Sequence, residues 1–125
     1  MKNTFKKAER LSSKIAIAKL FENGRSFTTY PFRVIWLDYS TGTSYPAQIA
    51  FTVPKKNFKR AVDRNKLKRR AREAYRKNKY RLYEYLKQKN RSMVFMLVYT
   101  SKEEIDYDVI EVKINAVIDR LMREV

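Results

Sequence analysis

The sequence predicts an α+β fold, in which helices pack against one small β-sheet. Three observations support this prediction. Apolar residues alternate or run continuously over three short segments, 32–37, 47–53 and 93–99, as they do in strands. Apolar residues recur at three- and four-residue steps over 107–125, which is typical of an amphipathic helix. A strongly basic stretch with helical spacing lies between the second and third strand segments.

The first expected element is a short amphipathic helix. Ser12 and Ser13 can cap its N-terminus, because a serine hydroxyl accepts a hydrogen bond from a backbone N–H of the first turn. Apolar residues at helical spacing extend it through Phe21, and Gly24 stands where a left-handed residue ends many helices.

Two or three strands are expected next, of which two have assigned ranges. Residues 32–37 alternate along a strand, and the turn-forming residues of 40–44 predict a hairpin loop after it. Residues 47–53 place Ala, Ile, Phe and Val on one face and smaller or more polar side chains on the other, which leaves that face shallow. Pro54 lacks a backbone N–H, so the strand should end there and the two lysines that follow should lie in a connection.

The segment 55–81 dominates the charge of the chain. It holds 14 of the 29 Lys and Arg residues and two of the 13 acidic ones, so 27 residues carry +12 of the net +16. A helix capped by Asp63 and beginning at Arg64 would bury one narrow stripe, formed by Leu67, Ala71, Ala74 and Tyr75. Cations cover both flanks of this stripe: Arg64, Lys68, Arg69, Arg72 and Arg76 on one, and Lys66, Arg70 and Lys77 on the other.

The last third of the chain predicts three elements. Residues 78–91 contain enough Tyr and Leu for a second short helix. The continuous apolar run 93–99 predicts a central strand covered on both faces. The helix of 107–125 closes the chain, with Asp106 or Asp108 near its N-terminal end, where negative charge is favoured.

Absent residue types exclude several functional classes. The chain has no cysteine and no histidine, which excludes disulfides and thiolate metal sites and removes the commonest general base. The acidic residues form no convincing catalytic pair, and there is no Gly-rich phosphate loop. No apolar run approaches the roughly 18 residues of a membrane-spanning helix. We therefore expect a soluble, cytoplasmic protein without a membrane partner.

The local concentration of positive charge predicts binding to nucleic acid, since it creates a potential that attracts a polyanion. An ordinary solvated face would mix signs, and the apolar stripe is too narrow to anchor the helix in a membrane surface. Asn65 fits two roles equally, as a local cap or as a ligand for a phosphate, a base edge or hydrated Mg²⁺. The aromatic residues are more typical of a core than of base stacking; the candidates for stacking are Phe21, Phe32, Trp36 and Phe51.

The residues around the basic segment resemble a known family. The segment 52–56, Thr-Val-Pro-Lys-Lys, and the segment 61–76, which begins Ala-Val-Asp-Arg-Asn-Lys, closely resemble the signature of the bacterial ribonuclease P protein subunit. The residues of 10–11 and 21–24 are similar to that family's N-terminal helix, and the order of elements extends the resemblance over nearly the whole chain. The resemblance implies one RNA-binding domain over residues 1–125. Its sheet would have about four strands in a ribosomal protein S5 domain 2-like fold, with a left-handed βαβ crossover.

The resemblance also implies a division of labour between protein and RNA. In that family the RNA subunit is a ribozyme that removes the 5′ leader from precursor tRNA with Mg²⁺, and the protein binds this RNA and the leader. We therefore expect the catalytic centre and the Mg²⁺ sites to lie in the RNA, and we assign no catalytic or metal-binding residue to the protein. The protein is expected to be monomeric apart from the holoenzyme.

Two sets of contact residues follow from the resemblance. The residues expected to face the catalytic RNA are Lys55, Lys56, Arg60, Arg64, Asn65, Lys66, Lys68, Arg69, Arg72 and Arg76. A cleft between the first helix and the sheet is expected to receive the single-stranded leader, lined by Ile17, Phe21, Phe32, Ala50 and Thr52. Two other classes remain open, a ribosomal or other structural RNA-binding protein without a role in cleavage, and a protein nuclease that uses Asp and Glu.

Overall fold

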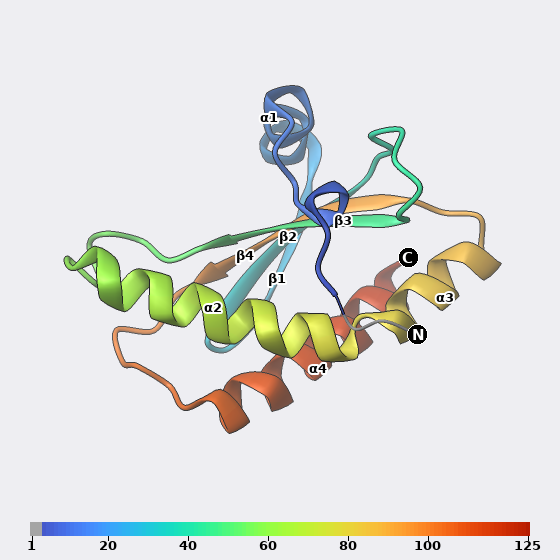
Figure 1. Ribbon diagram of the computed structural model, residues 1–125. Coiled ribbons are helices and arrows are strands. Elements are labelled where there is room, and N and C mark those ends of the chain that lie inside the picture. Colours follow the sequence, from blue (N-terminus) through green and yellow to red (C-terminus); the bar gives the residue numbers. More distant parts are fainter. Residues whose placement is uncertain (1–3) are drawn as a thin grey trace.

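The computed structural model describes residues 4–125, which form one mixed sheet with helices on both of its faces (Figure 1). The elements in chain order are η1 (Lys7–Glu9), α1 (Lys14–Asn23), β1 (Arg25–Thr29), β2 (Phe32–Asp38), β3 (Ala47–Thr52), α2 (Ala61–Asn78), α3 (Tyr80–Gln88), β4 (Met93–Tyr99) and α4 (Tyr107–Glu124). This architecture confirms the predicted α+β class.

The four strands lie in the order β1-β2-β4-β3. The pairs β1–β2 and β2–β4 are antiparallel, whereas β3 and β4 are parallel, so the chain must cross over between them through α2 and α3. β4 is central, as its continuous apolar sequence predicts. The hairpin expected after β2 was wrong, because β4 lies between β2 and β3 and the loop after β2 is a longer connection. The hairpin of this sheet instead joins β1, which the sequence did not predict as a strand, to β2.

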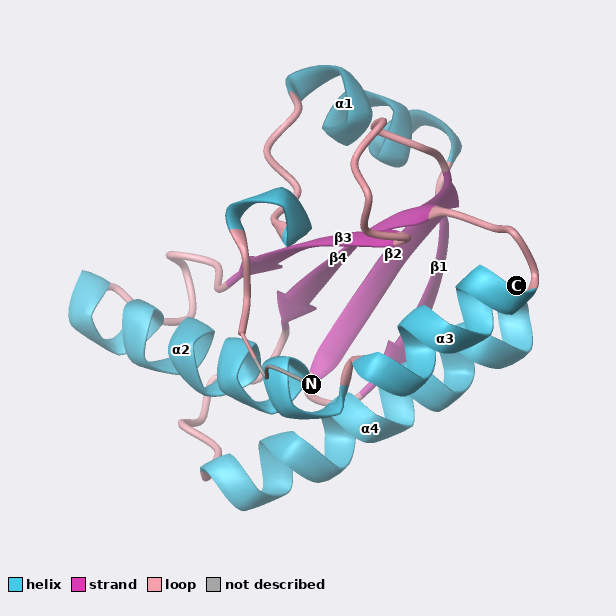
Figure 2. Ribbon diagram, turned by 45° about the vertical axis from the view of Figure 1, so that its right-hand side comes forward, coloured by secondary structure: helices cyan, strands magenta, loops and turns pink. Residues whose placement is uncertain are grey.

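The two faces of the sheet are covered unequally. Phe32, Val34 and Trp36 of β2 point into the main core, which is closed by α2, α3 and α4. The opposite face carries α1 (Figure 2). Ala16 and Leu20 of α1, together with Leu11 before it, pack on residues of β2 and β4. Much of this second face beyond α1 therefore stays accessible.

The ends of α1 show one confirmed and one wrong prediction. Ser13 caps the helix, since its hydroxyl accepts a hydrogen bond from Ala16 N at 3.2 Å. Gly24 follows the helix but has a φ of −70°, so it is not left-handed. Glycine is needed there for space, because a Cβ would collide with the Leu20 carbonyl oxygen.

The basic helix α2 begins earlier than predicted. Arg60 is its N-cap residue and Asp63 lies inside the first turn, so the prediction that Asp63 caps the helix was wrong. Arg60 Nε lies 3.9 Å from the Asp63 carboxylate. The predicted stripe is confirmed, because Leu67, Ala71, Ala74 and Tyr75 are all buried. The remaining faces of the helix are free to carry charge.

Candidate nucleic-acid interface

One flank of α2 is turned towards the loop before α4. Lys66 Nζ lies 2.8 Å from the Glu104 carboxylate, and this hydrogen bond lowers the pKa of Glu104 below its ordinary value. Arg70 donates a hydrogen bond to the Ile105 carbonyl oxygen at 2.8 Å. Lys66 and Arg70 are therefore engaged by other groups of the protein, and Lys77 lies over the Tyr107 ring. Lys66, which we expected to face RNA, does not share the open flank, and we leave it out of the candidate interface.

On the opposite flank, Arg64 donates to backbone carbonyl oxygens and Arg76 pairs with Glu73, but the three cations between them differ. Within residues 4–125, Lys68, Arg69 and Arg72 form no ion pair with a carboxylate. Burial lowers the pKa of Arg72, and the nearby positive charge of Arg10 lowers it further. The Nε of Arg72 is buried and has no hydrogen-bond partner among residues 4–125. A partly buried cation with an unused donor favours an anion as its ligand.

Arg10 joins this flank from the N-terminal segment. The segment runs beside β3, where Leu11 N donates to the Ile49 carbonyl oxygen at 2.9 Å. A cavity of about 270 Å³, which we call the N-terminal pocket, lies between the segment, β3 and α2. Its cationic lining residues are Arg10, Lys68 and Arg72, and its apolar ones are Phe5, Leu11, Ile49, Ala50 and Phe51. Sequence reasoning missed Arg10 as a site residue, because it lies far from the basic segment along the chain.

The connection before α2 carries Lys55 and Lys56, both exposed. Arg64 holds this connection in place, since its Nη1 donates to the carbonyl oxygens of Phe58 and Lys59, each at 2.8 Å. Arg64 therefore orients the loop as well as adding charge to the surface. Asn65 is exposed in the second turn of α2.

The strand register brings further side chains together on the open face of the sheet. Thr52 of β3 is paired with Val98 of β4, which is in turn paired with Arg33 of β2. Paired residues lie on the same face, so these three form one row across the sheet. One step towards α1, Ala50 and Met96 form the next row. Ala50, Thr52 and Val98 are half-buried and Arg33 is exposed, as expected for an accessible surface.

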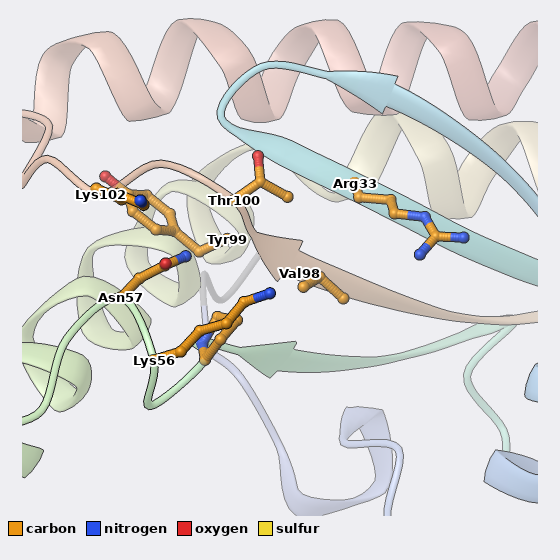
Figure 3. Close-up of a pocket in the computed structure, with 8 residues that line it drawn as sticks. Arg33, Lys56, Asn57, Val98, Tyr99, Thr100 and Lys102 are labelled. Atoms are coloured by element: carbon orange, nitrogen blue, oxygen red, sulfur yellow. The ribbon is translucent and has the colours of Figure 1, made fainter.

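A cavity of about 530 Å³ lies at the end of this row. We call it the sheet pocket; it is lined by Arg33, Pro54, Lys56, Asn57, Val98, Tyr99, Thr100 and Lys102. In Figure 3 the Val98 side chain lies between the Lys56 ammonium and the Arg33 guanidinium. The pocket thus combines an apolar floor with three cations, of which sequence reasoning predicted only Lys56.

The expected lining of the leader cleft is only partly brought together. Ile17 is half-buried and, like Ala50, packs against the buried cluster under α1. Phe21 lies one turn further along α1 and is 59% exposed. The prediction for Phe32 was wrong, since its side chain is only 2% exposed and belongs to the core on the other face of the sheet. Alternation along β2 puts Arg33, not Phe32, on the open face.

Comparison with known proteins identifies the family. The family model described as Ribonuclease P matches residues 5–122. A ribonuclease P protein component from Porphyromonas gingivalis is 35% identical over 105 residues, which cover 84% of this chain and 77% of that one. The chain belongs to the ribonuclease P protein family. It is thus a protein component of a ribonucleoprotein endoribonuclease of tRNA 5′ processing, with the ribonuclease P RNA as its partner.

Solved structures of ribonuclease P proteins share the fold. The protein from Thermotoga maritima matches with a TM-score of 0.69 at 25% identity, over 90% of this chain and 96% of that one. The protein from Staphylococcus aureus matches with a TM-score of 0.66 at 18% identity, over 92% of this chain and 96% of that one. The second likeness concerns the fold alone.

The acidic residues near the candidate interface lie beside basic side chains. Glu73 and Glu104 each contact a cation of α2, and Asp63 lies 3.9 Å from Arg60, the N-cap residue. In the part of the chain that the structure describes, no three His, Cys, Asp or Glu side chains gather as metal ligands would.

The same described residues contain no helix long and apolar enough to cross a membrane.

Proposed function

We propose that this member of the ribonuclease P family binds the catalytic RNA through the open flank of α2 and the N-terminal pocket, and guides the 5′ leader of precursor tRNA over the open sheet face. The observation that supports this most is the difference between the two flanks of α2. Lys68, Arg69 and Arg72 have no internal counter-charge within residues 4–125, whereas Lys66 has one.

Phosphate neutralisation accounts for the RNA-binding half of the proposal. Cations without carboxylate partners can release the counterions of a folded RNA when they contact its phosphates. The residues we assign to this surface are Arg10, Lys55, Lys56, Arg60, Arg64, Asn65, Lys68, Arg69, Arg72 and Arg76. Arg76, which pairs with Glu73, and Arg60, which lies near Asp63, should contribute less than the others.

The open sheet face accounts for the leader-binding half. An unpaired strand presents bases that stack on aromatic or apolar surface and phosphates that need cations. Ile17 and Phe21 of α1 offer apolar surface at one end, and the sheet pocket offers Arg33, Lys56 and Lys102 at the other. Ala50, Thr52 and Val98 lie between them.

We infer that Mg²⁺ and the catalytic centre belong to the RNA. The carboxylates closest to the basic flank are each engaged by Lys or Arg, so they do not form the oxygen-rich ligand set that Mg²⁺ prefers. The contribution of the protein is then electrostatic, because each phosphate that it neutralises no longer needs a diffuse cation.

Reconstitution tests this proposal. The chain is mixed with a bacterial ribonuclease P RNA at low Mg²⁺, and cleavage of precursor tRNA is followed against the RNA alone. We expect stimulation by the protein, together with tighter binding of a precursor that carries a leader than of the leaderless tRNA. RNA binding without stimulation would favour a purely structural RNA-binding protein. Cleavage by the protein without RNA would favour a protein nuclease.

A further inference from the structure

A buried ion pair fastens the N-terminal segment to the body of the protein. The side chains of Glu9 in η1 and Lys79, between α2 and α3, are each 1% exposed, and their charged groups are in direct contact. The Glu9 carboxylate also accepts a hydrogen bond from Tyr83 Oη at 2.6 Å. The Lys79 ammonium in addition contacts the Thr4 carbonyl oxygen. One ammonium therefore holds both ends of a six-residue segment.

Aromatic rings and a backbone N–H also surround this pair. The rings of Phe5, Tyr80 and Tyr83 lie 5.4–5.6 Å from the Lys79 ammonium. The second oxygen of the Glu9 carboxylate accepts a hydrogen bond from Lys6 N at 2.6 Å. A buried ion pair is often no more stabilising than apolar residues of the same size, so its main effect is to select one arrangement. We call Glu9, Lys79 and Tyr83 the latch.

Arg10, the residue next to the latch, is repelled by neighbouring cations. Arg10 follows Glu9 directly and lines the N-terminal pocket with Lys68 and Arg72. These like charges repel one another, and within the described chain no carboxylate neutralises the three. Without a fastening, this repulsion favours release of the segment from β3. The latch opposes this release by holding Glu9, the residue that precedes Arg10.

We propose that Glu9, Lys79 and Tyr83 are positioning residues, which hold Arg10 beside Lys68 and Arg72 so that the three cations converge on one phosphate of the RNA. This inference rests on the proposed function. It also gives a role to tyrosines of α3 that neither the RNA surface nor the leader face uses.

A double-mutant cycle on RNA affinity tests the inference. Arg10→Ala is measured in the unsubstituted protein, in Tyr83→Phe and in the pair Glu9→Gln with Lys79→Met, which removes both buried charges together. We expect Arg10→Ala to weaken binding to ribonuclease P RNA by about tenfold in the unsubstituted protein. In either latch variant its effect should fall below about threefold, because Arg10 is no longer held in place. Arg10→Ala should also reduce the slope of log affinity against log salt in the unsubstituted protein. The reduction should be smaller in either latch variant.

Arg69→Ala is the matched control, since Arg69 lies on α2 and belongs to neither the latch nor the pocket. Its effect should be the same in every background. An equal effect of Arg10→Ala in all backgrounds, with circular dichroism showing folded protein, would overturn the inference and leave the proposed function intact. If the variant with both Glu9→Gln and Lys79→Met fails to fold, Tyr83→Phe alone provides the test. Absence of RNA binding by the unsubstituted chain would overturn the proposed function and this inference with it.

Discussion

The two flanks of α2 carry the same kinds of side chain in different surroundings. On one flank, Lys66 forms an ion pair with Glu104, and Arg70 donates a hydrogen bond to a backbone carbonyl of the loop before α4. On the other, Lys68 and Arg72 line a pocket with Arg10, another cation. The C-terminal end of the helix adds a third case, where Lys79 is buried against Glu9. We therefore propose that the groups the fold places beside a basic residue decide whether it is a structural contact or an RNA ligand.

The largest effect on stability is expected when Glu9, the partner of the buried Lys79, is replaced. Glu9→Gln should lower the free energy of unfolding by about 3–5 kcal/mol, because Lys79 is left charged without its counter-charge. Urea denaturation measures this loss, and Glu9→Gln combined with Lys79→Met should recover most of it. A loss below about 1 kcal/mol, the usual size for a surface pair, would contradict the role given to the pair.

Two lysines of α2 compare its flanks directly. Lys68→Ala should weaken binding to ribonuclease P RNA by about 1.5–3 kcal/mol, because a charged contact to phosphate is lost. It should also reduce the slope of log affinity against log salt by roughly 0.7–0.9. Lys66→Ala, two residues away, is the control and should change neither quantity appreciably. Equal effects of both substitutions would show that the whole helix, and not one flank, faces the RNA.

The two flanks of α1 allow a similar test for the leader. Phe21→Ala should weaken binding of leader-bearing precursor tRNA to the holoenzyme by about 1 kcal/mol, the lower end of the range for base stacking. Binding of leaderless tRNA should not change. Ile15 is 69% exposed and points away from Phe21 around the helix, so Ile15→Ala is the matched control. A Phe21→Ala effect that is the same with and without a leader would remove Phe21 from the leader surface.

The smallest effect expected is a shift in acid stability. The pKa of Glu104 is lowered in the folded protein by its hydrogen bond from Lys66, so the pair stabilises the fold above the ordinary carboxyl pKa. This contribution is lost as pH falls through the lowered value. Lys66→Met should therefore reduce stability at neutral pH and leave it unchanged in acid, as thermal unfolding across pH 2–7 can measure. A uniform loss at every pH would point to packing in place of charge.

Most elements of the fold could be predicted from local patterns, and the exceptions have physical reasons. The stripe from Leu67 to Tyr75 and the central strand β4 were predicted correctly, because burial imposes the period of each element on its own residues. β1 was missed, since Phe27 is the only one of its five residues that is buried. The order of the strands could not be predicted from local patterns either. β4 lies between β2 and β3, and its pairings with them join residues distant in sequence.

The residues of the candidate site fall into the same two groups, those predicted from local sequence and those brought together only by the fold. Charge density and helical period belong to a residue and its near neighbours, so the chain alone specified a cationic helix with one thin apolar edge. Arg10, Arg33 and Lys102 joined the site only when the sheet and the N-terminal segment were in place. Glu104 and Glu9 likewise reach Lys66 and Lys79 only in the folded protein. Electrostatic contacts act over a few ångströms in space, and folding decides which distant residues come that close.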